Sequence, residues 1–186
     1  MSTVSNVTNG KPKIGGAIYR GALGTALPTD AKTALAEAFK CLGYCSDDGL
    51  VNSNSPKSES IKAWGGDTVL TYQKEKPDDF KYTLLEVLNP DVLAAVYGTA
   101  NVSGTLATGI SIKANAIEQE ESVWVFELVM RSGALKRIVV PDGKITAVGD
   151  VSYTDSDAVG YETTLSAMPD GTGNTHYEYI LRAAQA

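Results

Sequence analysis

The chain has 186 residues, which is the size of one domain and is enough to bury a hydrophobic core. Its hydrophobic fraction of 43% and charged fraction of 20% are typical of a globular protein. The net charge of -6, without a basic run, argues against a protein that grips nucleic acid by its phosphates. Like charge would still allow a polyanion to pass without sticking.

The N-terminal residues are polar and lack the positive start and apolar core of a signal peptide. We expect a flexible arm over residues 1–13. No apolar run reaches the roughly 20 residues that a membrane helix needs, so no membrane is expected. Cys41 and Cys45 have no second pair of ligands beside them, whereas a zinc site needs about four. The sequence therefore predicts two reduced structural thiols, no metal and no cofactor.

A strand and an amphipathic helix are expected next. Residues 14–21 are short and spaced by glycine, and form the first expected strand. Thr29 or Asp30 can then cap a helix, and Gly43 can end it. Between them the apolar residues recur at i, i+3, i+4 and i+7, at Leu35, Ala38, Phe39 and Leu42. This stripe predicts one helix that packs on a sheet.

The segment from Asn52 to Gly66 is expected to be a long loop between strands. Its first half is too polar for a core, and long loops without structure of their own are usually functional or disordered. Ile61 and Trp64 are apolar anchors that a solvated linker would not need. We predict a surface that contacts another subunit or ring, and call it the contact loop: Asn52, Ser53, Asn54, Ser55, Pro56, Lys57, Ile61 and Trp64.

Two strands and a second short helix follow the contact loop. The strands are expected at 68–75 and 80–84, the second with apolar and polar residues in alternation. Residues 76–79 (KPDD) are typical of a turn, so the two strands are predicted to pair as a hairpin. The helix begins at Asn89-Pro90-Asp91 and ends at Gly98.

Strands and turns make up the rest of the chain. PDGK at 141–144 is predicted to be a tight turn. The expected strands are 106–112, 122–131, 135–140, 145–154, 159–167 and 176–181. Many short strands with regular turns predict one mainly-β domain over residues 14–186. We expect a β-sandwich or barrel with one flanking α-helix and one short second helix.

The strand at 122–131 (SVWVFELVMR) is apolar on both faces apart from Glu127. Such a strand is either central between two layers or buried by another subunit. For the second case we predict a subunit seam formed by Trp124, Phe126 and Leu128.

No pattern of residues indicates an enzyme. His176 is the one histidine, and the sequence offers it no positioned partner for acid–base chemistry. The glycines at 15–16 and 171–173 are too few for a phosphate cradle. The acids Asp150, Asp155 and Asp157 do not have the spacing of an EF-hand. We expect no catalytic residue.

Five runs of the chain share a pattern with one family. The first three are PTDAKTALAEAFKCLGYCSDDGL, NSNSPKSESIKAWGGDTV and FKYTLLEVLNPDVLAAVYG, and the last two are ALKRIVVPDGKITAVGDVSYTDSDAVGYETTLSA and GNTHYEYI. Together they resemble the major tail (tail tube) proteins of bacteriophages with long, non-contractile tails, over residues 14–181. These runs are structural, so the resemblance transfers no active site.

The resemblance implies a virion structural protein that self-assembles into stacked hexameric rings. The tube would be a conduit for ejection of phage DNA, which passes without specific binding. Implied partners are further copies of the chain and the tape measure, tail terminator and tail tip proteins. Assembly would take place in the host bacterial cytoplasm.

Two other interpretations stay open. One is a related hexameric ring protein, such as a tail terminator or a secretion-system tube protein. The other is a monomeric β-sandwich that binds carbohydrate or a peptide through Trp64 and the tyrosines.

Overall fold

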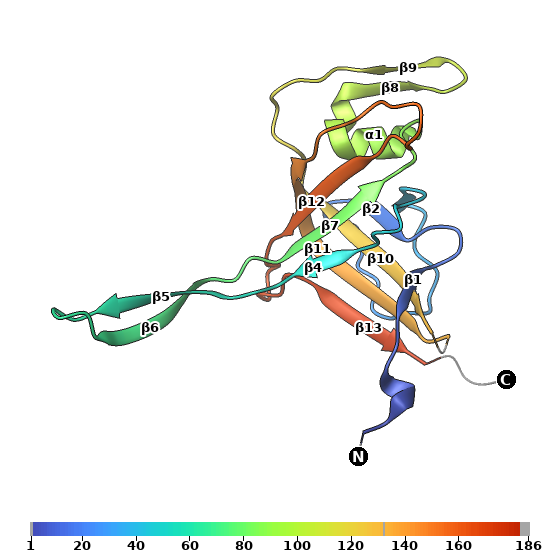
Figure 1. The fold of residues 1–186 in the computed structure, drawn as a ribbon. Coiled ribbons are helices and arrows are strands. Elements are labelled where there is room, and N and C mark those ends of the chain that lie inside the picture. The colour runs from blue at the N-terminus through green and yellow to red at the C-terminus, as the bar shows by residue number, and fades with distance from the viewer. Residues whose placement is uncertain (1, 132, 183–186) are drawn as a thin grey trace.

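The structure is a computed structural model that describes residues 2–131 and 133–182 (Figure 1). Within these residues one antiparallel sheet has nine strands, in the order β3-β2-β10-β11-β12-β7-β4, with β1 added beside β10 and β13 beside β11. The strands are β1 (Gly10–Pro12), β2 (Ile18–Ala22), β3 (Lys40–Cys41), β4 (Val51–Ser53), β7 (Asp79–Leu84), β10 (Ser122–Met130), β11 (Leu135–Val148), β12 (Tyr161–Ala167) and β13 (Tyr177–Leu181).

Two hairpins form separate two-stranded sheets: β5 (Lys57–Lys62) with β6 (Thr68–Glu75), and β8 (Val102–Thr105) with β9 (Gly109–Ile112). The helices are α1 (Pro90–Tyr97) and two 3-10 turns, η1 (Val4–Asn6) and η2 (Thr99–Asn101). The fold is mainly β, as predicted, and is consistent with a β-sandwich because the sheet does not close into a barrel.

The strand β10 lies at the centre, between two apolar layers. Successive side chains of a strand point to opposite faces, so Trp124 and Phe126 enter one core while Val123 and Val125 enter another. The strand is thus central between two layers, which was the first of the two alternatives. Each large apolar side chain buried in this way contributes about 1.5–3 kcal/mol.

The larger core lies between the sheet and α1. Helix residues Val92, Leu93 and Val96 are buried there with β7, β10 and β12 side chains. The rings of Phe80 and Phe126 stack with their centroids 5.2 Å apart. The smaller core, on the other face of β10, is covered by the irregular segment 23–39.

The helix predicted from Thr29 to Leu42 is wrong, because this segment forms bends and turns that lead into β3. Asp30 does cap the local amides of Lys32 and Thr33, each at 2.6 Å. The carbonyl oxygens of Asp30 and Thr33 instead accept hydrogen bonds from the guanidinium of Arg137, at 2.7 and 2.8 Å. Those oxygens would otherwise accept the amides four residues later.

The buried Arg137 thereby competes with helix formation. Its own charge is balanced by a charge-assisted hydrogen bond to Glu127, its cross-strand neighbour. Lys13 pairs with the other oxygen of Glu127 at 2.6 Å. Leu27, Leu35 and Phe39 still meet the sheet, so the apolar stripe was a correct signal of burial and a false signal of helix.

The second predicted helix is confirmed as α1. The amide of Asp91 donates a hydrogen bond to the side chain of Asn89 at 3.0 Å, and Pro90 occupies the first helical position. Gly98 follows the last turn with φ of 93°, a conformation that favours glycine.

The predicted pairing of 68–75 with 80–84 is also wrong. β6 pairs with β5, whereas β7 pairs with β12 and β4. Residues 76–79 therefore form no turn but an extended connection from the hairpin to the sheet. The expected long loop instead comprises the end of β4, a short connection, β5 and the tip of the β5–β6 hairpin, which projects away from the sheet (Figure 1).

The PDGK sequence lies inside β11, so the predicted turn is wrong as well. The register with β10 shifts between Trp124↔Val140 and Ser122↔Gly143. Proline cannot donate to a sheet and glycine bends a strand, so both residues are common at such bulges. At this point β11 exchanges its neighbour β13 for β12.

Two further segments differ from expectation. The expected strand 106–112 is instead the turn and second strand of the β8–β9 hairpin, next to α1 (Figure 1). Of the expected N-terminal arm, Gly10–Pro12 pairs with β10 as β1. The flexibility of the arm and the boundary at residue 14 stay predictions.

Candidate assembly surfaces

The β5–β6 hairpin belongs to a continuous run of exposed residues, 55–76. Every residue of both strands is exposed, on both faces of the ribbon. Four of these residues are large and apolar: Ile61, Val69, Leu70 and Tyr72. A two-stranded ribbon without a hydrophobic core is marginally stable in water. Its apolar residues are therefore available to another surface.

Polar cross-strand contacts hold the ribbon together. Glu59 accepts from Tyr72 at 3.1 Å and pairs with Lys74, and Lys57 pairs with Glu75 at 2.8 Å near the root. Such solvent-exposed ion pairs add little stability. They fix the shape of the ribbon without shielding its apolar residues.

The tip of the hairpin presents Trp64 to solvent. Ala63 donates its amide to the Asp67 carbonyl at 2.7 Å, and Gly66 donates to the Ala63 carbonyl at 3.0 Å. Gly65 and Gly66 have φ of 113° and 100°, which only glycine adopts readily. Trp64 is fully exposed at this turn.

The residues of the predicted contact loop fall on three parts of this region. Asn52 and Ser53 belong to β4, and Lys57 and Ile61 belong to β5. Residues 54–56 connect these strands, and Trp64 is at the tip. The group therefore runs from the edge of the main sheet along β5 to the hairpin tip, and its contact role stays a prediction.

The residues of the predicted subunit seam lie mostly in the core. Trp124 and Phe126 are each 1% exposed and are covered by the same chain. The Trp124 indole donates to the Gly143 carbonyl at 3.1 Å. Leu128 is half-buried and lines a surface hollow, so it retains surface for a seam. The seam role stays a prediction.

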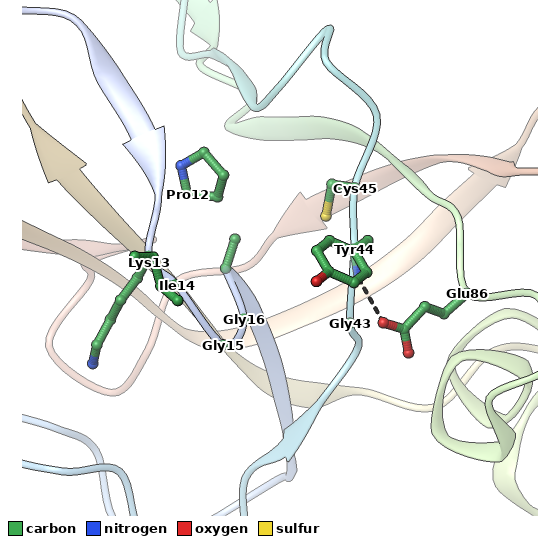
Figure 2. Close-up of a pocket in the computed structure, with 10 residues that line it drawn as sticks. Pro12, Lys13, Ile14, Gly15, Gly16, Gly43, Tyr44, Cys45 and Glu86 are labelled. Atoms are coloured by element: carbon green, nitrogen blue, oxygen red, sulfur yellow. Dashed lines mark hydrogen bonds between the residues drawn. The ribbon is translucent and has the colours of Figure 1, made fainter.

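A second hollow of about 410 Å³ lies between residues 12–17 and 43–45 (Figure 2). The Tyr44 amide donates to Glu86 at 3.0 Å along one wall, and the sulfur of Cys45 lies nearby. Burial, with Cys41 and Glu86 close by, raises the pKa of Cys45 to about 11. The thiol is therefore protonated at neutral pH and is a poor nucleophile and metal ligand. Cys41 and Cys45 are both free in the structure.

The partner of His176 is Asp78, which the sequence did not indicate. His176 Nδ1 lies 2.5 Å from Asp78 Oδ2, and the Thr175 hydroxyl donates to the same oxygen at 2.5 Å. Asn52 donates to Asp78 Oδ1 at 2.7 Å. The sequence predicted Asp78 in a turn, whereas it is 2% exposed in an extended connection. The pair is 98 residues apart, so no local pattern could have found it.

Metal-ligand clusters, membrane-spanning helices and the surroundings of His176 can each be checked in the described residues. In residues 2–131 and 133–182, no group of three His, Cys, Asp or Glu side chains could hold a metal ion. No described helix is long and apolar enough to cross a membrane. The hydrogen-bonded groups around His176 include no cysteine or lysine, and Thr175 donates to the same carboxylate as the histidine. The most prominent surface of this mainly-β fold is the projecting β5–β6 hairpin.

Comparison with models of known protein families identifies the family of this chain. Residues 13–186 match the phage tail tube protein family, and the chain belongs to that family. A search of curated proteins finds no match. The tail tube part of the resemblance is thereby confirmed, and the chain has a structural role in the tail of a phage virion. The long, non-contractile type of tail stays a prediction.

Proposed function

We propose that this chain is the major tail protein of a phage with a long, non-contractile tail. Its copies self-assemble into hexameric rings, the rings stack into a tube, and DNA leaves the virion through that tube. Membership of the tail tube family supports the role in the tube.

The projecting hairpin is the observation that carries the proposal. β5 and β6 pair with each other and, in the described part of the chain, with no other strand. Their apolar residues have no core of their own to cover. In a head-to-tail assembly the same patch repeats at every subunit, so modest contacts add up along the tube. The contact loop residues and Leu128 are our candidates for these contacts.

The charges support a tube that lets DNA pass without specific binding. Arginine or lysine facing the channel would form charge-assisted contacts with successive phosphates. Several cations are instead paired with acids of the same chain, among them Lys74 with Glu59, Lys136 with Glu178 and Lys144 with Glu118. We expect an acidic or neutral channel. The tape measure, tail terminator and tail tip proteins would be further partners, with assembly in the host bacterial cytoplasm.

A shortened hairpin tests the proposal. Residues 59–72 are removed, and Ser58 is joined to Gln73, its partner in the ladder, through an Asn-Gly turn. We expect a folded monomer that forms no tubes in negative-stain micrographs, while the parent forms tubes at the same concentration. The matched control is Leu106→Ser, which removes an exposed apolar residue from the β8–β9 turn and should leave tubes intact.

Three other outcomes would contradict the proposal. Normal tubes from the shortened variant would remove the hairpin from the mechanism. Single rings from the parent would favour a tail terminator, and a monomer whose elution shifts with sugar would favour a binding module.

A further inference from the structure

We propose that Asp78 is a positioning residue that fixes the direction of the β5–β6 hairpin for contact with a second copy of the chain. This inference rests on the proposed function. Among the described residues its carboxylate is hydrogen-bonded to Asn52, Thr175 and His176, none of which belongs to β5 or β6, so it acts through the hairpin's two connecting segments.

Two connecting segments join the hairpin to the main sheet. One connection leaves β4 at Ser53, and the other returns to β7 at Asp79. Asn52 lies beside the first connection and Asp78 ends the second. Their side chains meet at 2.7 Å, and Asn52 also donates to the Asp79 carbonyl at 3.3 Å. One carboxylate thus joins the two segments to each other.

The Asp78 carboxylate also joins these connecting segments to the main sheet. Thr175 and His176, directly before β13, both contact Oδ2 of Asp78 at 2.5 Å. The Asp78 carbonyl accepts the amide of Ala167 at 2.8 Å, at the end of β12. The imidazole of His176 is held edge-on against Phe80, with ring centroids 5.4 Å apart. The root of the hairpin is therefore attached to two strands of the main sheet.

Burial of the Asp78 carboxylate requires that its hydrogen-bond donors stay in place. A carboxylate that is 2% exposed is costly unless its charge is satisfied by donors, and here three side chains supply them. Beyond the root the hairpin makes ladder contacts only with itself, within the described residues. Fixing the root limits the directions in which the ribbon can point. An arm held in its binding direction loses less entropy when it contacts a partner.

A distance measurement on the monomer tests the positioning directly. Nitroxide labels are placed at Trp64→Cys on the tip and Glu162→Cys on β12, in a background with Cys41→Ser and Cys45→Ala. In the parent we expect one narrow tip-to-sheet distance distribution. Asp78→Asn should at least double its width while the circular dichroism of the sheet is unchanged. In unlabelled protein that keeps Trp64, Asp78→Asn should also raise the protein concentration needed for tube growth about tenfold or more.

Asn52→Ala is the second variant, because Asn52 is exposed and its loss should leave the sheet folded even if Asp78→Asn does not fold. Thr163→Val is the matched control: it removes a buried hydrogen bond to the Tyr82 carbonyl, within the sheet, and should keep the distribution narrow. A distribution that stays narrow in both root variants would overturn the proposal. So would a broad distribution with unchanged tube growth. If the parent forms no tubes, the proposed function fails, while the distances still decide whether Asp78 orients the hairpin.

Discussion

The β10–β11 pair and the β5–β6 hairpin are both antiparallel ribbons of β-forming residues, but their surroundings are opposite. β10 is buried on both faces, and β5 and β6 are exposed on both faces. The two tryptophans of the chain mark the contrast, with Trp124 1% exposed and Trp64 fully exposed. The same kind of residue stabilises the monomer in one ribbon, and in the other it is available for contact between copies.

Truncation of the two tryptophans should separate these roles most strongly. Trp124→Ala should lower the free energy of unfolding by about 3–5 kcal/mol, because it empties a core position. Trp64→Ala should change it by less than about 0.5 kcal/mol, since surface substitutions are usually small. Urea denaturation of the monomers measures both values. Equal losses in the two variants would show that the hairpin tip is part of the folded core.

The bulge in β11 should be sensitive to a single methyl group. A Cβ at Gly143 would lie 3.0–3.1 Å from side-chain carbons of Val140, Leu165 and Trp124. Gly143→Ala should therefore cost about 1–3 kcal/mol through overpacking. Gly171→Ala is the control, because a Cβ there meets open space and should change stability by less than about 0.5 kcal/mol. If both variants have the parent's urea midpoint, the bulge is not tightly packed.

Acid should weaken the root of the hairpin. Burial raises the pKa of Asp78, but hydrogen bonds from Thr175, Asn52 and His176 outweigh it and hold the pKa below its ordinary value of 3.8. The folded form thus binds the proton less readily than the unfolded form. The stabilisation is fully present above about pH 4 and is lost as the pH falls through the lowered pKa.

Urea midpoints measured from pH 6 to pH 2.5 test this effect. The parent should lose more stability over this range than Asp78→Asn, which has no carboxylate to protonate. Parallel curves for the two proteins would mean that Asp78 is not stabilised by its donors.

The smallest expected effect concerns the cysteines at the margin of the sheet. With a pKa of about 11, only about one Cys45 thiol in a thousand is ionised at pH 8. Alkylation of Cys45 at pH 8 should be at least tenfold faster in denaturant than in the native protein, as followed by peptide mass. Under denaturing, non-reducing conditions both cysteines should take up label. A mass without added label would reveal a disulfide.

Local signals predicted the parts of the fold that local contacts decide. The cap at Asn89, the proline at position 90 and Gly98 are enough to define α1, and alternation predicted β7 and β12. The mainly-β class followed from the same patterns. The apolar stripe at 35–42 failed because Arg137, 107 residues from Asp30, takes the helical carbonyls.

The candidate site was predictable in position but not in structure. The polarity of residues 52–60 and the apolar Ile61 and Trp64 indicated an exposed segment. Residues 68–75 (β6) had two candidate partners, β5 before them and β7 after them. Because β7 pairs with β12, β6 pairs with β5. The contact between Asp78 and His176 depends on the whole sheet being assembled.

That long separation also has a consequence for synthesis. A ribosome that adds roughly 5–20 residues per second needs about 5–20 seconds to progress from Asp78 to His176, which lie 98 residues apart. During this interval β5 and β6 have already been made, but Thr175 and His176 have not, so the carboxylate lacks two of its donors. On the proposed role of Asp78, the direction of the hairpin is therefore fixed only after Thr175 and His176 have been synthesised.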